Sequence, residues 1–156
     1  MATETTNSQE TAPRTLVVGL GVSGLATARY LAARGVPLAV TDSREQPPGL
    51  EELRRELADV ALFTGGFDPQ AFAAAERLVV SPGIAISTPI IQEAQARGVE
   101  VIGDVELFLR EARAPIIAIT GSNGKSTVTT LLGEMAAAAG IRAGVGGNLG
   151  KPVLEL

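Results

Sequence analysis

The sequence predicts an α/β protein built on a parallel β-sheet, and three features of its pattern support this prediction. From residue 15 onward, apolar runs of strand length alternate with longer segments of helical periodicity. The connections between them are short, as expected when each helix carries the chain back to the next parallel strand. Two of these connections, residues 19–24 and 120–127, are glycine-bearing turns that lead from a strand into a helix.

The composition narrows the class of protein. Of the 156 residues, 46% are hydrophobic and only 3% aromatic, so we expect a core of Ala, Val, Leu and Ile. A net charge of −4 argues against a nucleic-acid partner, which basic residues would have to bind. The chain has no Cys and no His, so disulfides, thiolate metal sites and imidazole bases are excluded. No apolar run approaches the ~20 residues that span a bilayer, so we expect a cytoplasmic protein with no membrane partner.

The first glycine turn lies in a strand, turn, helix, strand unit. Residues 1–14 are polar and are predicted to be a disordered tail. A strand at 15–18 then leads into Gly19-Leu20-Gly21-Val22-Ser23-Gly24, a G-x-G-x-x-G turn, and a helix over 25–34 that Gly35 ends. The following strand, 37–42, ends at Asp42, about where a dinucleotide fold places its ribose-binding acid. We interpret this unit as Rossmann-like.

The same alternation continues to residue 103. The sequence predicts helices over 50–57, from Asp68-Pro69 onward and over 88–97, and strands at 60–63, 77–80 and 99–102. Residues 15–103 are therefore expected to form one Rossmann-like domain, a parallel sheet with helices on both faces. Ligands of such sheets bind at the carboxyl ends of the strands, where Gly19–Gly24, Asp42–Arg44 and Ser81–Gly83 all fall. We expect these three loops to outline one pocket.

The second glycine turn opens a new unit. A linking helix is predicted over 104–110, a strand at 115–119, a helix over 128–139 and another strand at 141–145. Residues 104–156 are thus interpreted as a linker helix followed by the start of a P-loop ATPase-type α/β domain. Further strands and a second acid for magnesium, which such a domain normally has, are missing from the sequence.

Residues 120–127, Thr-Gly-Ser-Asn-Gly-Lys-Ser-Thr, have the chemistry of a phosphate-binding loop. Glycines let consecutive N–H groups converge on phosphate oxygens, and the helix N-terminus adds partial positive charge. Lys125 is expected to reach the terminal phosphates and the Ser126 hydroxyl to bind Mg²⁺. The loop departs from the strict G-x-x-x-x-G-K-[ST] pattern, because Ile119 stands where the first glycine belongs.

The loop GSNGKST (121–127) resembles the nucleotide loop of the Mur ligases, the ATP-dependent amide-forming enzymes of peptidoglycan synthesis. Four further stretches are similar to the members that add D-glutamate: GLGVSGLATARYLAARG (19–35), SPGI (81–84), GDVELF (103–108) and VGGNLG (145–150). The resemblance covers the chain from about Thr15 onward and corresponds to the N-terminal part of such an enzyme.

The resemblance implies substrates, cofactors and site residues. The substrates would be UDP-N-acetylmuramoyl-L-alanine, D-glutamate and ATP, with Mg²⁺, in a monomeric enzyme that forms an acyl phosphate before the amide. ATP phosphates would be bound by Gly121, Ser122, Asn123, Gly124, Lys125, Ser126 and Thr127, with Lys125 also catalytic and Ser126 a metal ligand. The UDP substrate would be contacted by Val22, Ser23, Asp42, Ser43, Arg44, Gly83 and Asn148. Because the family's later catalytic residues have no counterpart here, we expect the isolated chain to be inactive as a ligase.

Two other functions remain open from the residues alone. An NAD-dependent oxidoreductase would explain residues 15–42 but would leave the 121–127 loop without a role. A non-catalytic nucleotide-binding module would retain affinity for the UDP substrate only. Each motif also has a plain structural explanation: a tight strand-to-helix turn for the glycines, and solvated loop charges for Asp42 and Arg44.

Overall fold

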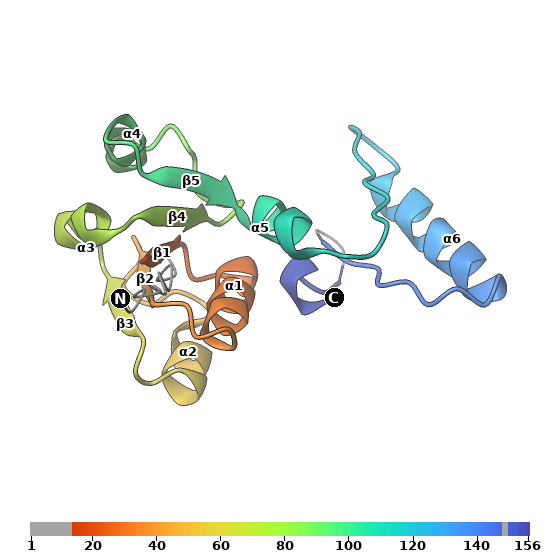
Figure 1. Cartoon of the computed structure of the whole chain (residues 1–156), viewed down its shortest axis with the longest axis horizontal. Coiled ribbons are helices and arrows are strands. Elements are labelled where there is room, and N and C mark those ends of the chain that lie inside the picture. The colour runs from red at the N-terminus through yellow and green to blue at the C-terminus, as the bar shows by residue number, and fades with distance from the viewer. Residues whose placement is uncertain (1–13, 148–149) are drawn as a thin grey trace, which may run out of the picture.

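A computed structural model describes residues 14–147 and 150–156 and confirms a parallel α/β fold (Figure 1). Its five strands are β1 (Thr15–Val18), β2 (Leu38–Asp42), β3 (Ala61–Thr64), β4 (Arg77–Val80) and β5 (Glu100–Gly103). Its helices are α1 (Val22–Ala32), α2 (Leu50–Glu56), α3 (Pro69–Ala74), α4 (Pro89–Ala96), α5 (Asp104–Glu111), α6 (Lys125–Ala138) and the short 3₁₀ helix η1 (Val153–Glu155). In the described part of the chain, no helix is long and apolar enough to cross a membrane.

Helices cover both faces of the sheet, as predicted, because neighbouring side chains of each strand point to opposite sides. On one face, Val17, Val40 and Val79 pack with apolar residues of α1, α2 and α5. On the other face, Leu16, Val18 and Leu78 pack with Phe72 of α3 and with α4. The core is aliphatic apart from Phe72, in agreement with the composition.

The strand order, β3-β2-β1-β4-β5, places a topological switch point between β1 and β4. From β1 the chain winds outward through β2 to β3, and then returns to the other side of β1 to form β4 and β5. At such a point the loops that follow the two central strands diverge and leave a crevice at the carboxyl edge. Here those loops are the Gly19 turn and Ser81–Gly83.

Both helices that follow the glycine turns begin earlier than the sequence predicted. α1 begins at Val22 rather than Leu25, and α6 begins at Lys125 rather than Val128. In each case the first helical turn lies inside the glycine motif and contains polar residues, so apolar periodicity cannot detect it. The N–H groups of these motif residues therefore belong to a helix N-terminus, where they have no partner within the helix.

The predicted strands at 115–119 and 141–145 were wrong: neither segment is a strand. Apolar β-branched residues favour a strand only when a neighbouring strand can pair with it, and no pairing is found for these segments among the described residues. Ile116 and Ile117 remain exposed, and only an isolated bridge joins Gly146 to Lys151.

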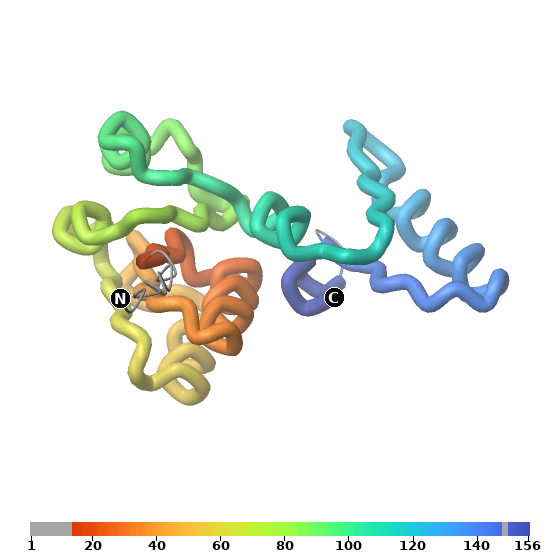
Figure 2. Tube along the Cα trace, viewed as in Figure 1, coloured from red at the N-terminus to blue at the C-terminus, as the bar shows by residue number. Residues whose placement is uncertain are grey.

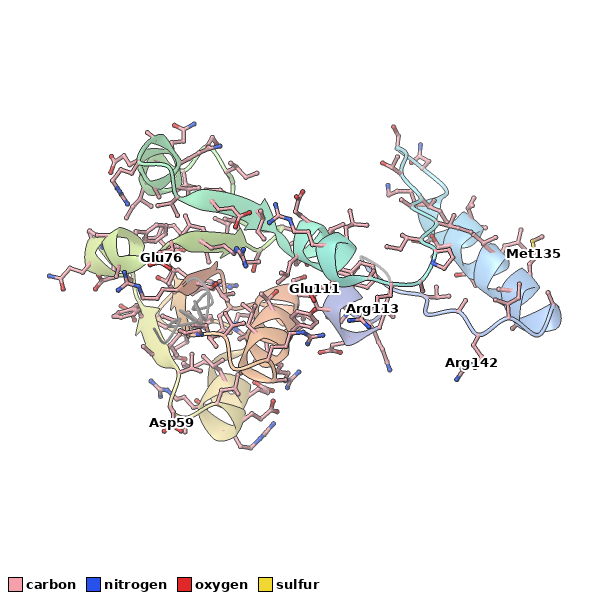
Figure 3. The ribbon with its side chains drawn as sticks, in the orientation of Figure 1. Asp59, Glu76, Glu111, Arg113, Met135 and Arg142 are labelled. Atoms are coloured by element: carbon pink, nitrogen blue, oxygen red, sulfur yellow. The ribbon has the colours of Figure 1, made fainter. Side chains whose placement is uncertain are left out.

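α6 is set apart from the sheet, and the chain then returns toward it (Figure 2). α6 has no buried residue, and Met135 lies toward its end remote from the sheet, whereas Arg142 lies on the segment that returns from it (Figure 3). The C-terminal η1 packs Leu154 against the α1 and α5 side of the core, and Glu155 pairs with Arg29 at 3.4 Å. Besides α5, whose Leu107 lies in the core of the sheet, the chain that follows α6 thus contacts the first domain.

Two predictions fall partly or wholly on residues outside the described ranges. The tail predicted at 1–14 is one, except for Arg14, which lies against the start of β4. The carbonyl of Arg14 accepts hydrogen bonds from the N–H groups of Glu76 and Arg77, and its side chain pairs with Glu76 at 3.3 Å. The predicted substrate contact Asn148 also lies outside these ranges.

Candidate functional site at the carboxyl edge of the sheet

The turn after β1 is held closed by direct packing of α1 on the backbone of Gly19. A Cβ at Gly24 would lie 1.8 Å from the Gly19 carbonyl oxygen, so only glycine fits at this position of α1. Gly19 has φ +97°, a conformation that favours glycine. These two glycines are therefore required by the turn itself.

Gly21 and Gly83 have no such structural requirement. Each has a backbone conformation open to other residues, and a Cβ at either position would meet nothing within 4 Å. Gly21 is the N-cap of α1 and Gly83 lies in the loop after β4, so both lie at the carboxyl edge of the sheet, beside the switch point between β1 and β4. Space that no protein atom uses, beside orphan N–H groups, suits a ligand whose oxygens approach the backbone closely.

Ser81 joins the two loops that border the crevice. Its hydroxyl donates to the Gly19 carbonyl oxygen at 3.0 Å, and its N–H donates to the Val18 carbonyl at 2.9 Å. The sequence predicts a loop at Ser81 but indicates no role for this residue. Its position directly after a buried strand, before Pro-Gly, was the available signal.

Asp42 is completely buried, and its carboxylate is filled by internal donors. Oδ1 accepts the N–H of Arg44 and its Nε, both at 2.9 Å. Oδ2 accepts the N–H of Leu20 and Nη2 of Arg44, both at 2.7 Å. Burial raises the pKa of Asp42, but the hydrogen bonds from Arg44 and Leu20 outweigh it and leave this pKa below its ordinary value.

The other residues predicted to contact the UDP substrate, as far as the structure describes them, lie along the same edge. Val22 is 70% exposed at the first position of α1, and Ser23 follows it, with its carbonyl accepting the Thr27 hydroxyl at 2.8 Å. Ser43 and Arg44 are exposed in the loop after β2. Because Gly19, Leu20, Asp42 and Ser81 are linked by hydrogen bonds, the three predicted loops do meet at one place.

The second glycine turn leads directly into α6, whose first residues belong to the predicted loop at 121–127. Gly124 is the N-cap of α6 and has φ +74°, a left-handed conformation that turns the backbone into the helix. Lys125, Ser126 and Thr127 form the first helical turn, and Lys125 Nζ donates to the Gly121 carbonyl at 2.5 Å. In the described ranges, no group of three or more Asp or Glu side chains is placed to hold a metal ion.

A separate apolar hollow lies at the opposite edge of the sheet. It has a volume of about 350 Å³ and lies at the amino ends of β1 and β2, beside α3. Its lining is apolar apart from Arg14, Thr15 and Gln70. Such a lining has few groups to bind a diphosphate, so we place the candidate site at the carboxyl edge instead.

Comparison with known protein families shows which family the chain belongs to. The family model described as "Mur ligase MurD-like, N-terminal domain" matches residues 13–103, more than half of the chain. The chain belongs to the MurD-like Mur ligases. The residues that match the family model include the whole five-stranded sheet and the loops at its carboxyl edge.

Curated relatives of this MurD-like chain are ligases. It is 58% identical over 141 residues to the UDP-N-acetylmuramoylalanine–D-glutamate ligase of Pseudomonas putida, covering 90% of this chain and 31% of that protein. The ligase of the same name from Marinobacter nauticus is 58% identical over 143 residues, covering 92% of this chain and 32% of the relative. The MurD-like chain therefore spans about a third of the length of these relatives.

Solved structures show the same fold at low identity. MurC, the UDP-N-acetylmuramate–alanine ligase of Thermotoga maritima, superposes with a TM-score of 0.56 at 18% identity, covering 81% of the MurD-like chain and 30% of MurC. The UDP-N-acetylmuramate:L-alanyl-gamma-D-glutamyl-meso-diaminopimelate ligase of Neisseria meningitides superposes with a TM-score of 0.57 at 18% identity, covering 90% and 46% of the two chains.

Proposed function

We propose that residues 15–103 bind the UDP part of UDP-N-acetylmuramoyl-L-alanine. The observation that carries this proposal is the unfilled space at Gly21 and Gly83, on either side of the switch-point crevice. The N–H groups of Val22 and Ser23 lie at the N-terminus of α1, where the helix dipole favours phosphate. We include Asp42, Ser43, Arg44 and Asn148 in this binding region on the strength of the family membership.

For residues 104–156 we propose a linker helix and the beginning of an ATP-binding domain. The left-handed Gly124 and the first turn of α6 would direct N–H groups at the ATP phosphates, together with Gly121, Ser122, Asn123 and Thr127. Lys125 would add positive charge next to them. The Ser126 hydroxyl is of the right type to hold Mg²⁺, which would neutralise phosphate charge when bound.

The whole protein is proposed to join D-glutamate to UDP-N-acetylmuramoyl-L-alanine. A carboxylate oxygen of the substrate attacks the γ-phosphorus of ATP, ADP leaves, and an acyl phosphate forms. The amine of D-glutamate then attacks the acyl carbon and loses a proton, phosphate leaves, and an amide forms. The proposed part of this chain is positioning and charge neutralisation, which supply most of the acceleration in phosphoryl transfer.

We further propose that the protein acts in the cytoplasm as a monomer without nucleic-acid or membrane partners. Two of its three proposed substrates are nucleotides, and a net charge of −4 disfavours binding to large polyanions such as nucleic acids.

Calorimetric titration of the chain with UDP-N-acetylmuramoyl-L-alanine, UDP and NADH tests the proposed function. We expect the two uridine nucleotides to bind and NADH to show no heat of binding. Binding of NADH without binding of either uridine nucleotide would instead favour the oxidoreductase alternative. Binding to this chain does not separate a ligase from a non-catalytic binding module. An assay of the whole protein with UDP-N-acetylmuramoyl-L-alanine, ATP and D-glutamate does, because only a ligase forms the amide product.

A further inference from the structure

The internal bonding of Asp42 leaves no acceptor for a ligand. An ionised carboxylate has about four lone-pair sites. In this structure four donors occupy them: the N–H of Leu20, and the N–H, Nε and Nη2 of Arg44. The side chain is 0% exposed. A ribose hydroxyl could reach this carboxylate only by displacing one of these donors.

Arg44 is fixed from several directions by the same arrangement. Its backbone N–H is held by Asp42, its carbonyl accepts the Gly65 N–H at 3.0 Å, and two guanidinium nitrogens are held by Asp42. The Nε and Nη2 fork that would grip a phosphate side-on is thereby used within the protein. The side chain is still 52% exposed, so part of it remains accessible to a ligand.

We propose that Asp42 is a positioning residue rather than a ligand of the nucleotide. Its carboxylate holds the Arg44 guanidinium and the Leu20 N–H in the arrangement that receives a uridine diphosphate, and Arg44 alone of the pair meets that ligand. Because these contacts occupy Asp42, its carboxylate cannot bind a ribose hydroxyl as the corresponding acid of dinucleotide folds does. This inference rests on the proposed function, because it assumes that the edge binds UDP.

Measuring the affinities of protein variants for a set of ligand analogues distinguishes a positioning role of Asp42 from direct contact with the nucleotide. The variants are Asp42→Asn, Arg44→Gln and the double variant; the ligands are UDP, 2′-deoxy-UDP, 3′-deoxy-UDP and N3-methyl-UDP. We expect Asp42→Asn to weaken every ligand by one common factor, roughly tenfold, because no ligand group bonds to Asp42. The double variant should be no weaker than the weaker single variant, because both remove the same Arg44 arrangement.

Direct contact gives a different result. If the effect of Asp42→Asn vanishes for one analogue, the group missing from that analogue bonds to Asp42 and the inference is overturned. Independent, multiplicative effects of the two single variants would overturn it as well. Failure of the unaltered chain to bind UDP is a separate outcome, which removes the proposed function itself.

A measurement on the unaltered chain covers the case in which Asp42→Asn does not fold. The Nε proton of Arg44 can be followed by NMR, and a hydrogen bond to a buried carboxylate slows its exchange with water. We expect slow exchange without ligand and the same slow exchange at saturating UDP. Rapid exchange before UDP is added, or release of this proton on binding, would contradict a preformed Asp42–Arg44 arrangement.

Discussion

The Ser81 hydroxyl donates to the carbonyl oxygen of Gly19 at 3.0 Å, and this bond connects the two loops that diverge at the switch point of the sheet. The same hydroxyl lies 3.0 Å from where a Cβ of Gly24 would stand. Ser81 therefore contacts both ends of the glycine turn. The turn depends for its shape on a residue that is far from it in sequence.

Replacing Ser81 with alanine should destabilise the chain and weaken nucleotide binding together. The buried Gly19 carbonyl loses a donor, which costs about 1 to 3 kcal/mol. A looser turn should also weaken UDP roughly tenfold. Thr88→Ala is a matched control, because the Thr88 hydroxyl also donates to a backbone carbonyl, that of Ala85, but in an exposed loop. Equal UDP affinity in Ser81→Ala and the unaltered chain would remove Ser81 from the site.

Alanine at Gly24 should reduce stability much more than alanine at Gly21. Gly24→Ala places a Cβ 1.8 Å from the Gly19 carbonyl, so unfolding free energy should fall by at least about 3 kcal/mol, although helix propensity alone predicts a gain of about 1 kcal/mol. Gly21→Ala meets no protein atom within 4 Å, so its loss should be limited to the lower N-cap preference of alanine, about 0.5 to 1 kcal/mol.

The methyl group added at Gly21 should mainly reduce the affinity for UDP. We expect Gly21→Ala to weaken UDP roughly tenfold or more, because its Cβ occupies the space proposed for phosphate oxygens. Urea unfolding and UDP titration of both variants check these expectations. Unchanged UDP affinity in Gly21→Ala would show that the open space beside the N-terminus of α1 is not where the nucleotide binds.

Acid should remove the stability that Asp42 contributes. Its pKa is lower in the folded chain than its ordinary value of 3.8, so the folded state binds fewer protons than the unfolded state in this range. The contribution is complete above about pH 5 and is lost as pH falls through 3.8 toward the folded-state pKa. The difference in unfolding free energy between the unaltered chain and Asp42→Asn should therefore shrink below pH 5. A difference that stays constant from pH 6 to pH 3 would contradict this role.

Glu100 joins three elements through two arginines. Its carboxylate accepts Arg77 Nε of β4 at 2.5 Å and also bonds to Arg110 of α5. Hydrogen bonds from Arg110 and then Arg77 lower the pKa of Glu100.

Because Glu100 is 38% exposed, screening by water limits the loss of unfolding free energy expected for Glu100→Gln to about 1 kcal/mol. Glu106→Gln, which breaks only the i, i+4 pair with Arg110, should cost less than about 0.5 kcal/mol. Urea unfolding of the two variants at low salt compares them, and an equal loss would deny Glu100 its bridging role.

The alternation of strands and helices was predictable from sequence because each element before residue 103 carries its own pattern of apolar residues. Arg77–Val80 is a fully apolar run after its first residue, and Asp68-Pro69 opens α3 by capping two N–H groups. The segment at 115–119 has an equally strong β-branched pattern and still forms no strand. A strand requires a neighbouring strand to pair with as well as a suitable apolar pattern. The sequence of one segment does not show whether such a neighbour is available.

The meeting of the three loops was predictable from the sequence, but their internal bonding was not. The glycine spacing and the acid at the end of β2 indicated loops at the carboxyl edge of the sheet, and hydrogen bonds join the loops there. That Asp42 is consumed by Arg44 and Leu20 depends on side-chain directions in the folded state, which sequence spacing does not determine. The link from Ser81 to Gly19 crosses 62 positions of the chain and has no local signal.

Lys125→Ala should abolish phosphate affinity of the second glycine turn without affecting the fold. The Lys125 side chain makes one hydrogen bond, to the exposed Gly121 carbonyl, so its loss should change stability by less than about 0.5 kcal/mol. Near the N-terminus of α6, its charge is expected to supply much of the attraction for a polyphosphate. NMR titration with ATP and Mg²⁺ should shift the amide signals of residues 121–127 in the unaltered chain and leave them unshifted in Lys125→Ala. Lys151→Ala, at an exposed lysine outside the turn, should retain the shifts. If Lys125→Ala binds ATP as well as Lys151→Ala does, the turn before α6 is not the phosphate site.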